Sequence, residues 1–188
     1  VRINPDSREA EAFRTLRTAV FFGVPRDEAR TIVVTSPAPG EGKSTVVSNL
    51  AIAMAQQGAL LAAKTQFEKG QADAAKASLA WAAENAVEDE IRTIARLRLA
   101  ALQADAKQYD EALKSLDSAK APAFEGLVAD RRGDVLMLQG KKDEARVAYQ
   151  TAYKGLGEKT EYRRLVEAKL VALGVPPEPA VAASGAGQ

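Results

Sequence analysis

The sequence contains no cysteine and no histidine among its 188 residues. Without cysteine there are no disulfides or thiolate nucleophiles, and without histidine there is no imidazole acid–base catalysis; both usual zinc ligands are lost together. An excess of one charge is also missing, because 26 Lys and Arg residues face 25 Asp and Glu residues, a net charge of +1. This balance provides no basic field for binding nucleic acid or an anionic membrane. We therefore expect no nucleic-acid partner.

Long apolar runs are scarce as well. Residues 1–6 lack the apolar stretch of a secretory signal. Residues 44–63 carry no charge, but polar side chains such as Ser48 and Gln56 interrupt them. We therefore expect this stretch to be a helix of a soluble protein rather than a membrane span. As written, the chain is expected to be cytoplasmic.

Residues 31–45 join a β-branched run to a glycine-containing loop. The run 31–35 predicts a short strand, and a helix is expected to begin at Lys43. The loop between them ends in Gly40-Glu41-Gly42-Lys43-Ser44-Thr45. This order is typical of a P-loop: amides of Gly40 to Thr45 cradle phosphate, Lys43 meets the β- and γ-oxygens, and Ser44 ligates magnesium when nucleotide is bound. Pro37 stands where the standard spacing has glycine, so the motif is a variant.

The loop alone is not expected to bind nucleotide. Three or four charge-assisted hydrogen bonds to phosphate contribute roughly 1.5 to 3 kcal/mol each. Ordering about eight loop residues costs roughly 1 to 2 kcal/mol apiece, so the two terms nearly cancel. An intact sheet would order the loop in advance, but a lone strand has no sheet to join. We expect no cofactor, and ATP with magnesium only if the P-loop is functional.

Residues 7–58 contain several motifs in a fixed order: Glu11-Ala12-Phe13-Arg14-Thr15-Leu16-Arg17, Ile32 to Ser36, Pro39 to Thr45 and Asn49-Leu50-Ala51. Together they closely resemble the start of the bacterial tyrosine kinases that regulate exopolysaccharide export. The resemblance implies that Glu11, Arg14 and Arg17 help to assemble a ring of subunits; the alternative is a solvated i, i+3 face. The later aspartate motifs and the tyrosine-rich tail of that family are missing. The catalytic residues are therefore absent, and we expect no enzyme activity.

From Leu60 onward a three-residue phrase recurs. It reads Asp73-Ala74-Ala75, Asp110-Glu111-Ala112 and Asp143-Glu144-Ala145, and its final alanines are 37 and 33 residues apart. This spacing is close to the 34 residues of a tetratricopeptide repeat. Alignment on these alanines predicts a small residue in each first helix and a large one in each second helix, with a second small residue after it. The small residues of the first helices are Ala63, Ala100 and Gly133. The large residues of the second helices are Leu79, Leu116 and Tyr149, and the small residues after them are Ala82, Ala119 and Ala152.

The most specific segment of this region is Leu127-Val128-Ala129-Asp130-Arg131-Arg132-Gly133-Asp134-Val135. With it, residues 59–174 resemble the periplasmic tetratricopeptide domain of the ancillary subunit of the SecYEG translocon. The resemblance implies a non-enzymatic scaffold that binds a protein or peptide partner, with translocon or envelope proteins as candidates. The family is anchored in the inner membrane, with its repeats in the periplasm. Asp130, Asp134 and Met137, at i, i+4 and i+7, are the candidate groove residues; the alternative is a solvated helix face.

The predicted fold is mainly α: a tetratricopeptide-type helical repeat array preceded by a truncated α/β P-loop fragment of the form helix, strand, loop, helix. We expect the P-loop-like fragment in residues 1–58, the repeats with a capping helix at 160–173 in residues 59–174, and a disordered tail in residues 175–188. At the seam, the helix from Lys43 is expected to run to about Gln57 and, through Gly58, to join the first repeat helix as a single rod or as a kinked pair.

Two other functions remain open. The chain could be an ATP-binding regulator or kinase in which the repeats are an adaptor. It could instead be a join of two unrelated genes, made by rearrangement, assembly error or deliberate joining, because both resemblances are truncated near Gly58.

Overall fold

The structure is a computed structural model that describes residues 7–23, 33–35, 42–157 and 160–175. The chain divides into two compact units, Val1–Ala95 and Arg96–Gln188. The dividing point lies inside a helix of the repeat region, whereas residue 58, the predicted domain boundary, lies inside a different helix. None of the residues that the structure describes is in a β-strand, which agrees with the predicted mainly α fold.

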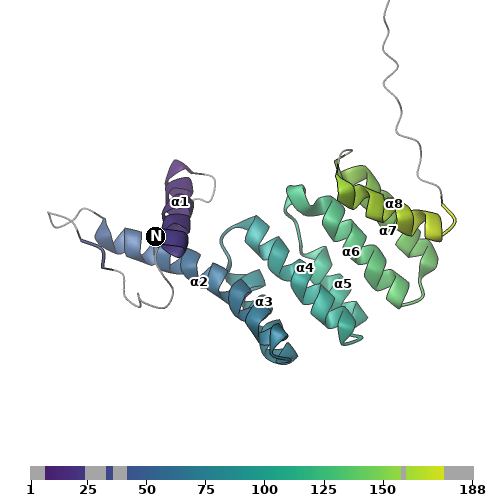
Figure 1. The fold of residues 1–188 in the computed structure, drawn as a ribbon, viewed down its shortest axis with the longest axis horizontal. Coiled ribbons are helices and arrows are strands. Elements are labelled where there is room, and N and C mark those ends of the chain that lie inside the picture. The colour runs from purple at the N-terminus through teal and green to yellow at the C-terminus, as the bar shows by residue number, and fades with distance from the viewer. Residues whose placement is uncertain (1–6, 24–32, 36–41, 158–159, 176–188) are drawn as a thin grey trace, which may run out of the picture. The chain divides into compact units, whose positions relative to one another are not determined.

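The first unit contains α1 (Arg8–Gly23), α2 (Lys43–Glu68), α3 (Ala72–Asn85) and the beginning of α4 (Asp89–Asp105). Both α1 and α3 pack against α2, α1 near its N-terminal half (Figure 1). The helix α2 is unbroken across the seam, as predicted, and an added Cβ at Gly58 would meet no atom within 4 Å. It is also the one described helix that is long and apolar enough to cross a membrane by length and composition.

The second unit contains the rest of α4, then α5 (Tyr109–Asp117), the 3₁₀ turn η1 (Pro122–Phe124), α6 (Glu125–Leu138), α7 (Lys142–Gly155) and α8 (Glu161–Ala172). Figure 1 shows α6, α7 and α8 as neighbouring rods, and α6 packs on α5 and α7 while α7 packs on α8. The helix α8 coincides with the predicted capping helix, with Thr160 at its N-cap and Leu173 at its C-cap.

The three helix pairs α2/α3, α4/α5 and α6/α7 follow the predicted alternation of small and large residues. The three alanines of the recurring phrase, Ala75, Ala112 and Ala145, are completely buried. The third pair has the closest approach: an added Cβ at Gly133 would lie 2.4 Å from Cε1 of Tyr149. A tyrosine ring therefore occupies the space that an alanine side chain would need.

The turn between the helices of each pair has the same backbone geometry. Gly70 and Gly140 have φ values of +74° and +78°, and Lys107 occupies the matching place in the second pair with φ +60°. At each turn this residue donates its N–H to the carbonyl three residues earlier, and the next residue donates to the carbonyl five earlier. This is the Schellman arrangement, which favours glycine at the left-handed position.

A side-chain hydrogen bond also repeats between paired helices. Ser78 donates to Oε1 of Gln66 in the first pair, and Ser115 donates to Oε1 of Gln103 in the second, each at 2.8 Å. In the third pair the matching positions, 33 residues later, are held by Ala148 and Leu136, which are both buried. The third pair thus replaces a polar contact by an apolar one.

The predicted strand at 31–35 is wrong for the part that the structure describes. Residues 33–35 have no regular secondary structure, and Val33 is 81% exposed. Residues 31 and 32 lie outside the described residues. The physical reason is that a strand is stable only when paired, and no other described segment is extended in a sheet.

Candidate functional site

Asp130, a predicted groove residue, lies inside the second unit. Its side chain is completely buried in α6. The carboxylate accepts a hydrogen bond of 2.6 Å from the Tyr162 hydroxyl and bonds of 2.8 and 2.9 Å from Nζ of Lys169. The prediction that Asp130 faces a partner is therefore wrong, because the buried carboxylate is held by two side chains of the capping helix α8.

Asp134 lies one turn after Asp130 and joins the same cluster. Its Oδ1 accepts hydrogen bonds from Tyr149 at 2.9 Å and from Lys169 at 2.7 Å. Its Oδ2 lies 3.6 Å from Nη1 of Arg131, and its side chain is 28% exposed. Lys169 therefore bridges two carboxylates and joins α6 to α8, while Tyr149 joins them to α7.

Met137, the third predicted groove residue, is half-buried and packs against the core cluster of α6, α7 and α8. The structure thus brings Asp130 and Asp134 together through Lys169 but places Met137 in an apolar contact. A contact of Asp134 or Met137 with a partner stays a prediction.

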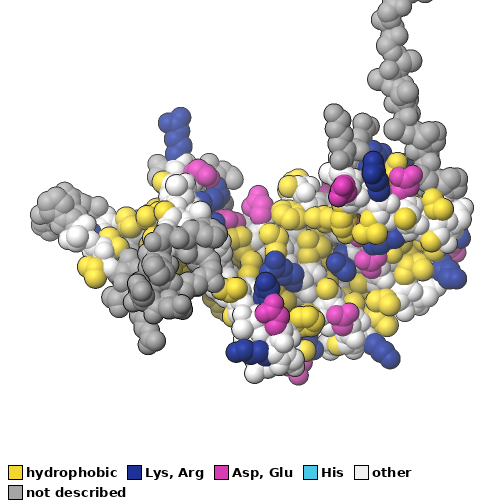
Figure 2. Space-filling model, viewed as in Figure 1, with side chains coloured by type: hydrophobic (Ala, Val, Ile, Leu, Met, Phe, Trp, Pro, Cys, Tyr) yellow, Lys and Arg dark blue, Asp and Glu magenta, His cyan; other side chains and the backbone are white. Residues whose placement is uncertain are grey.

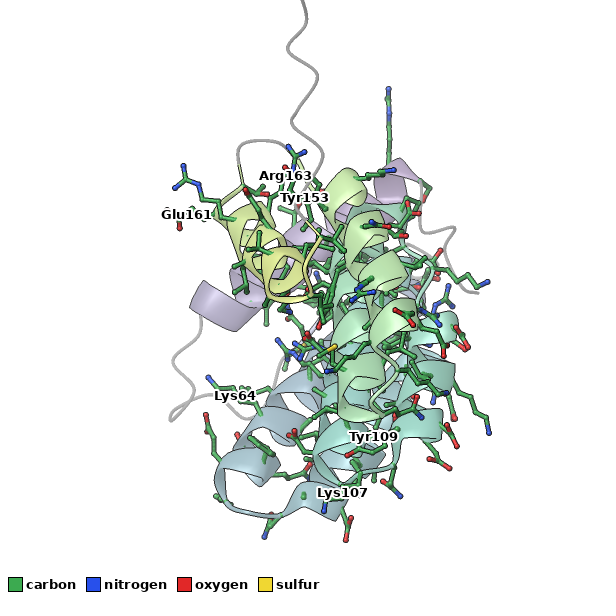
Figure 3. The ribbon with its side chains drawn as sticks, turned by 90° about the vertical axis from the view of Figure 1, so that its right-hand side faces the viewer. Lys64, Lys107, Tyr109, Tyr153, Glu161 and Arg163 are labelled. Atoms are coloured by element: carbon green, nitrogen blue, oxygen red, sulfur yellow. The ribbon has the colours of Figure 1, made fainter. Side chains whose placement is uncertain are left out.

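Two phenols in this cluster are held neutral. Burial, followed by the hydrogen bond to Asp134, raises the pKa of Tyr149 well above its ordinary value of 10. Burial and the hydrogen bond to Asp130 raise the pKa of Tyr162 in the same direction. Both hydroxyls act as donors to carboxylates rather than as acids or nucleophiles, so the arrangement is suited to fixing α8. Nearby, the guanidinium carbon of Arg163 lies 4.0 Å from the ring centre of Tyr153, a cation–π contact that also ties α8 to α7 (Figure 3).

The structure describes only the helical half of the predicted P-loop. Gly42 has φ +82° and forms the N-cap of α2, and Lys43, Ser44 and Thr45 form the first turn. Gly40 and Glu41 lie outside the described residues. Among the residues that are described, no three Asp or Glu side chains come together where they could hold a metal ion. Binding of nucleotide through Lys43, or of magnesium through Ser44, stays untested by this geometry.

Glu11, Arg14 and Arg17 form one charged face of α1, and the face is not simply solvated. Arg14 pairs with Glu11 at 2.7 Å and approaches Glu88 at 3.4 Å, while Arg17 reaches the same Glu88 at 3.2 Å. The hydrogen bond that Arg14 donates to Glu11 is the largest influence that raises the pKa of Arg14, with the charge of Glu88 adding to it against the effect of burial. In the sequence, Glu88 is followed by Asp89 and Glu90 at the start of a helix. Acidic residues at this place indicate a favourable interaction with the helix dipole, but they do not indicate an arginine partner.

The second unit exposes apolar side chains that sequence reasoning did not single out. Leu138 on α6 is 57% exposed, Val147 on α7 is 63% exposed, and Leu165 and Val171 on α8 are 50% and 57% exposed. Figure 2 shows apolar side chains between interspersed charges of both signs on the face it presents. The helical period could have marked these positions as outward-facing, but only the packed structure separates them from equally apolar core residues.

Two groups of known proteins match the chain. The ancillary SecYEG translocon subunit of Neisseria gonorrhoeae is 33% identical over 119 residues, 63% of this chain and 57% of that protein. The subunit of the same name from Escherichia coli is 30% identical over 143 residues, 76% of this chain and 64% of that protein. Tyrosine-protein kinase YwqD of Bacillus subtilis is 44% identical over 54 residues, 29% of this chain and 23% of the kinase. The chain thus spans about three fifths of the translocon relatives and a smaller share of the kinase. No solved structure matches.

A family model described as a tetratricopeptide repeat-like domain matches residues 45–175. This range begins within the first turn of α2, runs through all three helix pairs and ends just after α8. It covers well over half of the sequence. The chain therefore belongs to the tetratricopeptide repeat-like domain family.

Proposed function

We propose that the chain is a non-enzymatic scaffold whose helix pairs bind a partner polypeptide at the SecYEG translocon of the bacterial inner membrane. The observation that carries the proposal is the unbroken run of three helix pairs and a capping helix within residues 45–175. Relatives named as ancillary SecYEG translocon subunits support the choice of partner. Helix pairs of this type bind polypeptides through side chains of their first helices.

The exposed apolar residues indicate where contact would occur. Leu138 is at the end of a first helix, α6, and is 57% exposed. Val147 is equally apolar and 63% exposed, but it lies on a second helix, α7. Burial of one such side chain at an interface contributes roughly 1.5 to 3 kcal/mol. Loss of Leu138 should therefore weaken binding about tenfold or more, whereas loss of Val147 should not.

The test is binding of the full chain to SecYEG reconstituted in lipid nanodiscs, measured by biolayer interferometry. We expect saturable binding that Leu138→Asp weakens and that the matched control Val147→Asp leaves unchanged. No saturable binding would refute the translocon as partner. Equal loss in both variants would refute the first-helix surface. Circular dichroism of each variant checks that its helices are retained.

A second candidate is an ATP-binding protein of the exopolysaccharide tyrosine-kinase type, favoured by the 44% identity over 54 residues. We propose instead that this chain works without ATP or magnesium. A P-loop is ordered by a paired sheet, and none of the described residues is in a β-strand. Calorimetric titration of ATP and magnesium into the full chain tests this. We expect no binding in the micromolar range and no ATP turnover. Micromolar binding that Lys43→Ala abolishes would establish the second candidate.

A further inference from the structure

Two arginines of α1 converge on one carboxylate oxygen in the first unit. Nη1 of Arg17 lies 3.2 Å and Nε of Arg14 lies 3.4 Å from Oε1 of Glu88. Glu88 stands immediately before α4 and is 71 positions from Arg17 in the sequence. This contact therefore ties the first helix of the chain to the link between the first and second helix pairs.

The contact is shielded from water. The Arg17 side chain is 10% exposed and that of Glu88 is 17% exposed, whereas Glu11, which pairs with the same helix face, is 67% exposed. Nε of Arg17 is buried and makes no hydrogen bond to any described residue. A buried pair of this kind is weakly screened by salt, and removal of one partner leaves an uncompensated charge.

Apolar packing alone stabilises the position of α1 on α2 only weakly. Between Lys43 and Ala55, Leu50 is the one residue of α2 that is buried. Val47 and Ile52 on the same stretch are 48% and 37% exposed, and Leu16 of α1 is 39% exposed. A 16-residue helix is only marginally stable without tertiary contacts. The position of α1 therefore depends strongly on Glu88.

We propose that Glu88 is an internal ligand of the Arg14–Arg17 pair, a clasp that holds α1 against the link before α4 and gives way to an acidic peptide segment. Release of the clasp frees two guanidinium groups from one carboxylate. Guanidinium pairs recognise carboxylates through charge-assisted hydrogen bonds. A partner segment rich in Asp or Glu is thus the class of ligand that competes with Glu88. This inference is independent of the proposed translocon role.

Hydrogen exchange of the full chain tests the clasp. In Glu88→Gln, amide exchange across residues 11–20 should rise about tenfold or more, while residues 135–138 of α6 should be unchanged. The control is Asp89→Asn, which removes one negative charge from a side chain that is 62% exposed. In the double variant Glu88→Arg with Arg17→Glu, protection of α1 should return. Unchanged exchange in Glu88→Gln, or no recovery in the double variant, would overturn the clasp.

Binding of a fluorescein-labelled hexaglutamate peptide tests the ligand class. Removal of the internal competitor in Glu88→Gln should tighten binding about tenfold relative to the wild-type chain. Asp89→Asn has the same net charge and should bind like the wild type. Addition of Arg17→Gln to Glu88→Gln should remove the gain. Equal affinities of Glu88→Gln and Asp89→Asn would overturn the assignment of an acidic ligand.

Discussion

Replacement of Gly133 by alanine tests the central packing rule of the repeats. The new Cβ would lie 2.4, 2.5 and 2.8 Å from Cε1, Cδ1 and Cζ of Tyr149. The ring cannot easily move aside, because its hydroxyl is bonded to Asp134 and its side chain is buried in the core of α6, α7 and α8. Overpacking of this kind costs about 3 kcal/mol, at the upper end of the usual range.

A helical Gly→Ala change also brings a favourable term of about 1 kcal/mol from helix propensity. The net destabilisation of Gly133→Ala is therefore about 2 kcal/mol, which corresponds to a decrease in Tm of roughly 4 to 8 °C for a chain of this size. Gly58→Ala is the matched control, because Gly58 also lies inside a helix and an added Cβ there meets no atom within 4 Å. Its Tm should rise.

Thermal denaturation followed by circular dichroism measures both variants. A third variant, Gly133→Ala with Tyr149→Leu, recreates the alanine–leucine pair of the other two repeats and should recover part of the loss, although it removes the hydrogen bond to Asp134. A Gly133→Ala variant as stable as the wild type would refute the reasoning, as would a Gly58→Ala variant that is equally destabilised.

Three further outcomes follow from the geometry. Lys107→Gly should raise the free energy of unfolding in a urea titration by about 1 kcal/mol. Lys107, labelled in Figure 3, has φ +60°, and glycine adopts this left-handed conformation without the steric cost of a side chain. A lower free energy of unfolding would contradict this. Lys169→Met should lower the free energy of unfolding by about 3 kcal/mol, since it leaves the buried carboxylate of Asp130 without its cation. The control is Lys154→Met at an exposed position, and equal effects of the two changes would contradict the role of the Lys169–Asp130 bridge. Burial and carboxylate contacts raise the pKa of Tyr149 and Tyr162, so stability is fully present below about pH 10 and falls as pH rises further. Tyrosinate absorbance should then show both phenols still protonated at about pH 11 in the folded chain, and complete ionisation of a folded sample at that pH would be the contrary result.

Sequence reasoning succeeded where a residue type has one physical use. Ala75, Ala112 and Ala145 could be placed in the core because close helix packing requires small side chains at a fixed spacing, and all three are fully buried. Gly70 and Gly140 could be placed in turns because glycine adopts positive φ at little cost. The unbroken course of α2 through Gly58 was also predictable, since one glycine costs less than the helix gains on both sides.

Sequence reasoning failed where the environment of a side chain depends on residues far away in the sequence. Asp130 has the spacing of a surface residue on α6, but Lys169 and Tyr162, more than thirty positions later, make its burial possible. Glu88 lies just before a helix start, but no local sequence pattern could assign it to Arg17. Lys107 at a left-handed position has no sequence signal of its own, because the turn around it imposes the conformation.

Because α2 is unbroken, the position of α1 in the first unit depends on how residues are rotated around the α2 axis. Each residue of an α-helix turns the chain by about 100° and advances it by about 1.5 Å. The half of α2 after the seam is fixed, because Ala59 and Leu60 pack against the core of Ala82, Ala83 and Ala95. The half before it carries the buried Leu50, and α1 packs against α2. One residue inserted or deleted at Gly58 would swing that face about a quarter of a turn away from Glu88, so the number of residues between Leu50 and Ala59 sets where α1 can lie.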